Sequence, residues 1–172
     1  MILETPRLRI REMTADDAAF MLALLNDPAF IRNIADRGVR TVQAARDYIA
    51  AGPIASYAQH GFGLCLVELI DGGVPIGICG LLKRNELPEP DIGFAFLPPY
   101  RSQGYAREAA GAVLAYGRDQ LGLTRLLAIV NPSNEPSIRL LERLGFSYES
   151  MVRLTPASPE LKLFASNVEP AC

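Results

Sequence analysis

The residues best placed for chemistry form a short loop between a strand-like run and a long amphipathic segment. The apolar run 91–97 leads through two prolines into Arg101-Ser102-Gln103-Gly104-Tyr105-Ala106. A helix that begins at this loop has first amides without intrahelical partners, and its peptide dipoles add positive potential there. Gly104 lets the backbone approach an oxygen atom closely, Ala106 keeps the next turn small, and Arg101 supplies a cation. The loop therefore predicts a phosphate site.

This loop differs from the two commonest nucleotide-binding motifs. It contains no Gly-x-x-x-x-Gly-Lys-Ser/Thr, so no lysine is placed for a terminal phosphate. It also lacks a Gly-x-Gly-x-x-Gly with a following acid for the ribose. A nucleotide hydrolase would need that lysine and metal-binding residues, which the sequence does not supply. We therefore expect a phosphate-bearing ligand that is not a hydrolysed nucleotide, and no metal.

Composition limits the remaining classes of function. The chain has 172 residues, of which 49% are hydrophobic and 21% charged, and its net charge is −2. This length fits one domain, residues 1–172. The negative charge gives no general support for nucleic-acid binding, and no apolar run is long enough for a membrane span. Because the N-terminus lacks a signal-peptide pattern, we expect a cytoplasmic protein.

The cysteines and the single histidine do not indicate a reactive centre. Cys65, Cys79 and Cys172 have no spacing typical of a metal site. The first two lie in apolar strand-like runs and are expected in the core, whereas Cys172 is terminal and expected to be disordered. His60 precedes a Gly-Phe-Gly turn and is expected to be structural or exposed.

Alternation and helical spacing predict the order of the elements. A strand at 7–13 precedes a helix that begins at 14–17 and ends at 26–28, an irregular stretch at 29–40, and a helix that begins at Thr41 and is broken at Gly52-Pro53. Helical turns at 54–60, strands at 62–70, 74–83 and 91–97, a long helix from 104, a strand at 124–130, a helix from Asn134 to Gly145, and strands at 146–154 and 161–165 complete the chain. This order predicts an α+β fold with one mixed sheet.

Three motifs in sequence make the chain similar to the GNAT superfamily of N-acetyltransferases, which bind acetyl-coenzyme A. They are the N-terminal Leu3-Glu4-Thr5-Pro6-Arg7-Leu8, the Arg-x-x-Gly-x-Ala loop, and the turn 131–134 with the helix that ends in Gly145-Phe146. The first resembles the opening of the branch that includes ribosomal-protein N-terminal acetyltransferases. The resemblance covers about residues 3–166, the expected core of the domain. It implies a single GNAT-like domain whose central sheet is mixed, mostly antiparallel and twisted, with flanking helices.

The same resemblance implies how acetyl-CoA, the expected co-substrate, is held. The strands that end at Leu97 and Val130 would be parallel neighbours that splay at their ends, so that Phe96 and Leu97 offer backbone groups to the pantetheine arm. The pyrophosphate would lie over the loop, and Asn131 and Asn134 would hydrogen-bond the amides of the arm. The loop residues concerned are Arg101, Ser102, Gln103, Gly104, Tyr105 and Ala106.

The implied reaction is direct acyl transfer, in which a neutral amine attacks the thioester carbonyl. Backbone donors would stabilise the oxyanion, and a hydroxyl would protonate the leaving thiolate. Many relatives place a tyrosine on the last helix for this protonation, and the matching position here is Leu141. Ser137, which matches the serine of the ribosomal-protein branch, is the candidate acid, or it only supports the first turn of its helix. Asp91 is the candidate base, and Glu86 and Glu89 in the preceding loop or a water chain are the alternatives.

The acceptor is expected to be a primary amine, either a protein N-terminus or a small amine. Glu86, Glu89 and Asp91 are hypothesised to form an acidic channel that suits a cationic amine. An alternative is a non-catalytic acyl-CoA-binding module or sensor, which the loop supports equally and the missing tyrosine slightly favours. The expected partners are acetyl-CoA and an amine acceptor, without nucleic acid or membrane, and the protein is expected to be a monomer or a homodimer.

Overall fold

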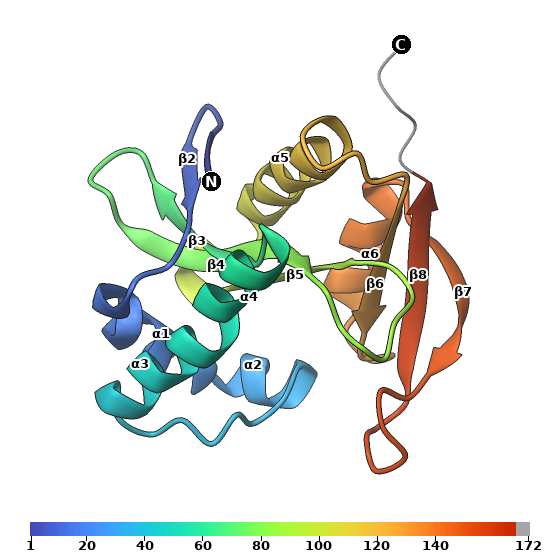
Figure 1. The fold of residues 1–172 in the computed structure, drawn as a ribbon, viewed down its shortest axis with the longest axis horizontal. Coiled ribbons are helices and arrows are strands. Elements are labelled where there is room, and N and C mark those ends of the chain that lie inside the picture. The colour runs from blue at the N-terminus through green and yellow to red at the C-terminus, as the bar shows by residue number, and fades with distance from the viewer. Residues whose placement is uncertain (168–172) are drawn as a thin grey trace.

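In the computed structural model, which describes residues 1–167, eight strands form one mixed sheet with the order β1-β2-β3-β4-β5-β6-β8-β7 (Figure 1). The strands are β1 (Ile2–Glu4), β2 (Leu8–Arg11), β3 (Leu64–Leu69), β4 (Pro75–Leu82), β5 (Asp91–Phe96), β6 (Arg125–Val130), β7 (Ser147–Val152) and β8 (Leu161–Asn167). The α-helices are α1 (Ala18–Leu25), α2 (Pro28–Asn33), α3 (Val42–Ile49), α4 (Ala55–His60), α5 (Tyr105–Asp119) and α6 (Glu135–Arg143). The predicted α+β class and the mostly antiparallel sheet are confirmed.

The two central strands separate where the site was expected. β5 and β6 run parallel, whereas the other neighbouring strands are antiparallel. Their pairing is limited to Asp91 opposite Leu127, where the Leu127 amide donates to the Pro90 carbonyl at 2.9 Å. Beyond this contact no further pairing joins the two strands, and in Figure 1 β5 runs to the left whereas β6 runs downward. The predicted splay is therefore confirmed.

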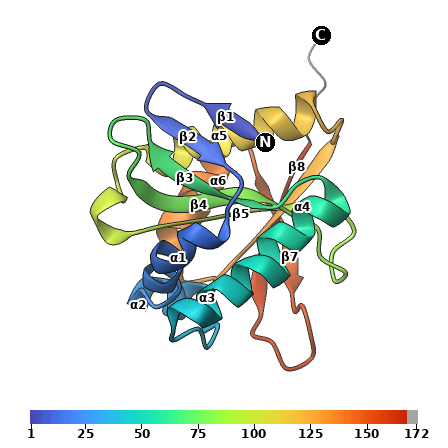
Figure 2. The same ribbon diagram turned by 60° about the vertical axis from the view of Figure 1, so that its left-hand side comes forward.

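Helices cover both faces of the sheet and form two cores. On one face, α5 and α6 pack on β2–β6 and β8, with Val113, Ile138 and Phe164 among the buried residues. On the other face, α1–α3 pack on Leu66 and Ile78, and Figure 2 shows α3 and α4 crossing in front of the strands. Cys65 and Cys79 are buried in the first core, as predicted. Cys172 lies outside the described residues.

Three local predictions were wrong, each for a physical reason. The stretch 29–40 is not wholly irregular, because Asp27 accepts the Phe30 amide at 3.1 Å and caps the short helix α2. The pair Gly52-Pro53 does not break the helix, since a π-helical segment at Ala50–Ile54 continues α3 into α4. The strand predicted at 7–13 is present as β2 but ends at Arg11, since the Met13 amide donates to the Tyr57 hydroxyl at 3.0 Å; its hairpin partner β1 was not predicted. Within residues 1–167, no helix is long and apolar enough to cross a membrane.

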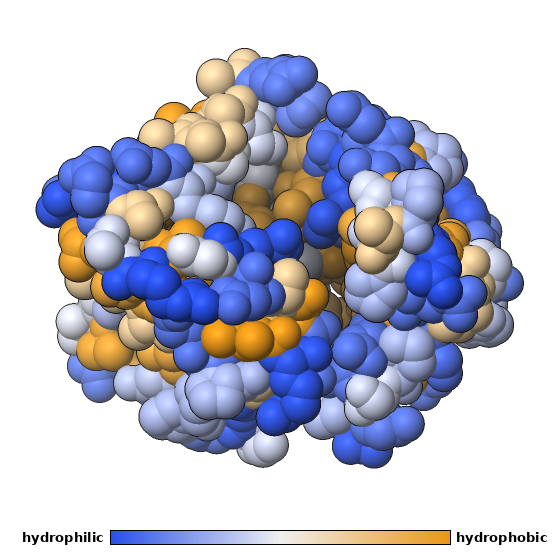
Figure 3. Space-filling model, turned by 90° about the horizontal axis from the view of Figure 1, so that it is seen from below, coloured by the Kyte–Doolittle hydropathy of each residue, from blue (hydrophilic) through white to orange (hydrophobic). Residues whose placement is uncertain are grey.

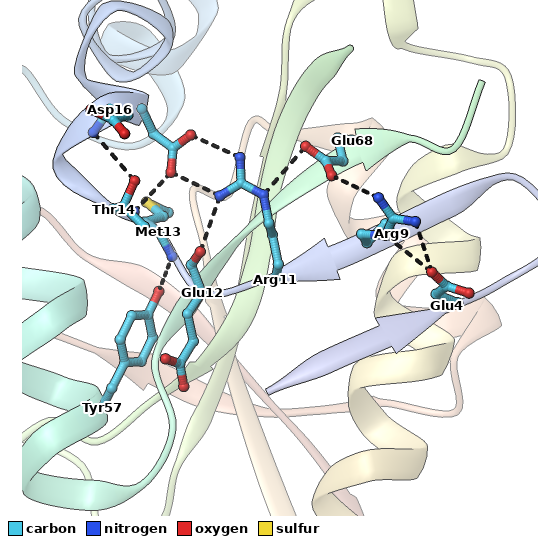
Figure 4. Close-up of polar contacts among 10 residues, drawn as sticks. Glu4, Arg9, Arg11, Glu12, Met13, Thr14, Asp16, Tyr57 and Glu68 are labelled. Atoms are coloured by element: carbon cyan, nitrogen blue, oxygen red, sulfur yellow. Dashed lines mark hydrogen bonds and ion pairs between the residues drawn. The ribbon is translucent and has the colours of Figure 1, made fainter. Parts of the chain in front are cut away.

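A ladder of charges secures the N-terminal hairpin on the outer side of β2 (Figure 4). Arg9 pairs with Glu4 at 3.0 Å and with Glu68 at 3.6 Å. Arg11 pairs with Glu68 at 3.3 Å and with Asp17, the acid of a capping box, at 2.9 Å. The shared carboxylates tie the hairpin to β3 and to the turn before α1, so the N-terminal segment is held firmly beside α5.

Candidate active site

The loop before α5 presents a run of free backbone donors. Among residues 1–167, no hydrogen-bond acceptor is found for the amides of residues 102–107, and the first helical bond runs from the Glu108 amide to the Gly104 carbonyl at 3.0 Å. Ser102 and Gly104 have φ of 60° and 82°, which turn successive amides toward one side of the loop. Consecutive amides in such a turn form an anion-binding concavity. The geometry therefore suits the phosphate site expected from the sequence.

The N-terminal motif clamps this loop, a role that the sequence did not indicate. Glu108 accepts hydrogen bonds from the Thr5 hydroxyl at 2.5 Å and from the Arg7 side chain at 2.7 Å. Arg7 also donates to the Gln103 carbonyl at 3.0 Å, and its guanidinium lies 4.3 Å from the ring centre of Tyr105. Partial burial alone would raise the pKa of Glu108. The hydrogen bonds from Thr5 and Arg7 outweigh this effect, so the pKa of Glu108 is lowered. Glu108 is therefore held as a carboxylate.

Arg101 is engaged within the protein. Its Nε donates to the Phe96 carbonyl at 2.9 Å, and its Nη2 lies 2.6 Å from Asp27 Oδ2. Since Asp27 also caps α2, Arg101 joins the end of β5 to that helix. The predicted contact of Arg101 with phosphate stays a prediction, and the backbone amides are the donors already available.

Some backbone N–H and C=O groups of β5 point into the gap where β5 and β6 separate. The Leu97 amide donates to the Ile76 carbonyl at 3.0 Å, and the Leu97 carbonyl accepts from Tyr100 at 3.0 Å, so neither is free. Because backbone groups alternate along an antiparallel strand, those of Phe94 and Phe96 point away from β4 and toward β6. Phe94 was missed, although strand alternation alone could have indicated it. The Phe96 carbonyl already accepts from Arg101.

A cavity of about 270 Å³ opens where β5 and β6 separate, bounded by the end of α2, the start of α6 and the segment between β7 and β8. Seen from below, Figure 3 shows a hollow with apolar atoms in its depth and polar atoms around its rim. The predicted catalytic residues Ser137 and Asp91 both line this cavity, as do Asn131, Asn134 and Leu141. The structure thus brings together residues that lie far apart in the sequence.

Ser137 has a hydroxyl that the helix does not use. Its backbone amide donates to Asn134 Oδ1 at 3.4 Å, which caps α6. No hydrogen bond of the Ser137 hydroxyl is found within the described residues. Asn131 Oδ1 accepts from the amide and the hydroxyl of Ser133, at 3.0 and 2.8 Å. Both asparagines therefore shape the turn with their oxygens and keep their amide nitrogens as donors.

Asp91 is buried at the base of the cavity and paired. Its side chain is 1% exposed, and Arg84 Nε donates to its two oxygens at 3.0 and 3.2 Å. Burial raises the pKa of Asp91, and the opposing effect of Arg84 does not cancel the increase. A carboxyl with a raised pKa in a cavity is a better proton acceptor than an ordinary one.

The acidic channel proposed from the sequence is not formed. Neither Glu86 nor Glu89 lines the cavity. Glu86 is exposed, and Glu89 lies 3.7 Å from Arg125. His60, at the end of α4, stacks on Phe62 with 5.9 Å between ring centres, away from the cavity lining. Of the candidate acids, Asp91 alone is in place.

Comparisons with known proteins bear on the family and the fold of the chain. A model of the acetyltransferase (GNAT) domain matches residues 7–147. An uncharacterised N-acetyltransferase of Bacillus subtilis, YnaD, is 40% identical over 153 residues, which are 89% of this chain and 86% of that protein. A GNAT-family acetyltransferase of Bacillus anthracis has a TM-score of 0.80 at 27% identity, covering 97% of this chain and 98% of that one. A ribosomal L7/L12 α-N-protein acetyltransferase in complex with coenzyme A has a TM-score of 0.83 at 14% identity, covering 98% of both chains.

Proposed function

The chain belongs to the GNAT family of acyl-CoA N-acyltransferases, and on this premise we propose that it transfers an acetyl group from acetyl-CoA to a primary amine bound between β5 and β6. GNAT acetyltransferases use acetyl-CoA as co-substrate. The acceptor amine belongs to a protein N-terminus or to a small molecule.

The observation that carries the proposal is the run of unpaired amides at 102–107, directly after the strand that borders the cavity. Peptide amides at a helix start suit a pyrophosphate. An extended arm that continues from this loop along β5 meets the backbone groups of Phe94 on its way into the cavity. Its thioester end then lies near Ser137 and Asp91.

Asp91 and Ser137 each have a step in the proposed transfer. The amine must lose a proton to attack, and Asp91 accepts it directly or through a water. As the carbonyl oxygen gains negative charge, an amide that faces the splay stabilises it. The C–N bond forms, the C–S bond breaks, and the Ser137 hydroxyl donates a proton to the leaving thiolate. Water then returns a proton to Ser137 and takes up the proton that Asp91 accepted from the amine, so both residues regain their starting states. Holding both substrates in one cavity supplies much of the rate.

Mixing the purified protein with acetyl-CoA and a panel of amines tests the proposal. The panel contains short peptides with free N-termini, amino acids and polyamines, and the readouts are thiol release and the mass of the acetylated product. We expect coenzyme A and an N-acetylated amine in equal amounts. Tight binding of acetyl-CoA without transfer to any amine would favour the acyl-CoA-binding module instead.

A further inference from the structure

The charged lining of the cavity is positive overall. Within the described residues, its charged side chains are Arg37, Arg84 and Asp91. The Lys83 ammonium group donates to the Arg84 and Leu87 carbonyls at 3.3 and 3.0 Å. From this position its positive charge acts on Asp91. The cavity therefore offers one buried carboxylate and a surplus of cations.

The Asp91 carboxylate is already paired with Arg84. The guanidinium groups of the lining, in contrast, have N–H donors without an acceptor. Arg84 holds Asp91 through Nε, and no acceptor for its terminal nitrogens is found in residues 1–167. Arg37 is exposed on the segment after α2 and has no ion pair among these residues. Its neighbour Asp36 is bound by Arg40 at 2.7 and 2.8 Å. Two arginines thus have donors directed to no group of the described chain.

We infer that the acceptor is an amine whose own molecule carries a carboxylate, and that Arg37 binds this carboxylate at the rim of the cavity. The inference rests on the proposed function, because it treats the cavity as the acceptor site. Guanidinium donors match the geometry of a carboxylate. Arg84, which also lines the cavity, adds positive charge for the same anion while it holds Asp91.

Charge and size both disfavour a polycationic acceptor. A polyamine would bring two or more positive charges beside Arg37 and Arg84 without a free carboxylate to meet them. A cavity of about 270 Å³ lies at the small end of ligand sites. It suits an amino acid or the end of a chain, with the amine at the base near Asp91 and the carboxylate at the rim.

A binding measurement tests this without requiring turnover. The probes are N-acetylglycine, N-acetyl-β-alanine and 4-acetamidobutanoate, each compared with its carboxamide, and N1-acetylspermidine is the polycation. Isothermal titration into the protein, with coenzyme A present, gives each Kd. We expect at least one acid to bind about tenfold tighter than its amide, the usual effect of a charged hydrogen bond.

Variants assign the preference to Arg37. In Arg37→Gln the acid should bind about tenfold more weakly while the amide keeps its affinity. Arg46→Gln, which removes an exposed arginine of α3 outside the cavity, should keep the wild-type preference.

Three results would overturn the inference: equal affinities for every acid and its amide, tighter binding of N1-acetylspermidine than of every acid, or an acid preference that persists in Arg37→Gln. A thiol-release assay with the free amino acids distinguishes failure of the inference about the acceptor from failure of the proposed function. If the protein preferred the acids but transferred acetyl to no amine, the proposed function would be overturned. The molecule that carries the bound carboxylate would then not be an acetyl acceptor.

Discussion

At the scale of single residues, Ser137 and Asp91 occupy complementary environments in one cavity. Ser137 has a hydroxyl without a partner in the described chain, at the start of α6. Asp91 is almost fully buried and held by Arg84. A free donor and a carboxyl with a raised pKa are the groups that protonation of a thiolate and deprotonation of an amine require.

Replacing Ser137 tests its role as the acid. Ser137→Ala should lower kcat about 100-fold, the effect typical of losing a general acid, and leave the Kd of acetyl-CoA unchanged. Ser133→Ala, on the same turn but outside the cavity lining, is the control. A kcat within twofold of wild type in Ser137→Ala would mean that Ser137 only supports its helix.

Asp91 should titrate above the ordinary carboxyl pKa of 3.8. Since Arg84 lowers this pKa, Arg84→Gln should raise it further. Carboxyl-carbon NMR of both proteins measures the midpoints, and a lower midpoint in Arg84→Gln would contradict the account. Because the folded-state pKa is raised, Asp91 favours folding below pH 3.8, and this contribution is lost as the pH rises through the folded pKa.

Sequence reasoning proposed Asp91 and Ser137, which the fold places in one cavity, but did not point to Arg37 and Arg84, which line the same cavity. A family resemblance marks positions of shared chemistry, so it led to the acid and the hydroxyl. Arg37 lies in a segment without regular spacing, and Glu86 and Glu89 looked equivalent to Asp91 as loop carboxylates. Only the fold shows which of these charges reaches the cavity.

At the scale of elements, the start of α5 and the N-terminal turn act as one unit. No acceptor is found in residues 1–167 for the amides of residues 102–107, of which 105–107 are the first of α5, and Ser102 and Gly104 before them adopt positive φ. Thr5 and Arg7 fix this geometry through Glu108. A phosphate site made of backbone depends on such supports, since it has few side chains of its own.

Gly104→Val tests the loop. A β-branched residue strongly disfavours a φ of 82°, and its Cβ would lie 3.3 Å from Arg7 Nη2. We expect the Kd of coenzyme A to rise at least about tenfold, because strain of 1–2 kcal/mol or more falls on the amides. Gly52→Val is the control, since its Cβ meets nothing within 4 Å and its φ is negative. Wild-type affinity in Gly104→Val would refute the loop assignment.

Glu108→Gln tests the contacts of Glu108 with Thr5 and Arg7. The variant loses the ion pair to Arg7, which is half-exposed, so we expect about 1 kcal/mol less stability and a Kd for coenzyme A raised several-fold. Urea unfolding and titration measure the two effects. Glu142→Gln, an exposed change on α6, provides the comparison. If coenzyme A bound equally well to all three proteins, the N-terminal motif would have no part in shaping the loop.

Most element types were predictable, and the exceptions involve proline. Alternation and helical period located β3, β4, β5, α5 and β6. Pro28 looked like the end of a helix but also begins α2, and Pro53 is accommodated by a π-helical turn. Local rules treat proline as a breaker, whereas the packing of Phe30 and Pro53 in the core decides the outcome here.

At the scale of the whole molecule, the sheet topology creates the site. β5 and β6 are parallel neighbours joined through α5, and they pair at one position before they separate. The same divergence opens the cavity and turns amides of β5 toward it. The order of elements in the sequence predicted the parallel pair and its crossover helix, and the family resemblance implied that the two strands separate. The charge of the cavity depends on segments from distant parts of the chain and could not be predicted.

Isothermal titration of acetyl-CoA, coenzyme A and ATP into the purified protein tests the central claim most directly. The account predicts micromolar binding of acetyl-CoA and coenzyme A and no heat with ATP, since the loop lacks a lysine for a terminal phosphate. Absence of acetyl-CoA binding to well-folded protein, or equal binding of ATP, would contradict the assignment of the loop and of the cavity beside it.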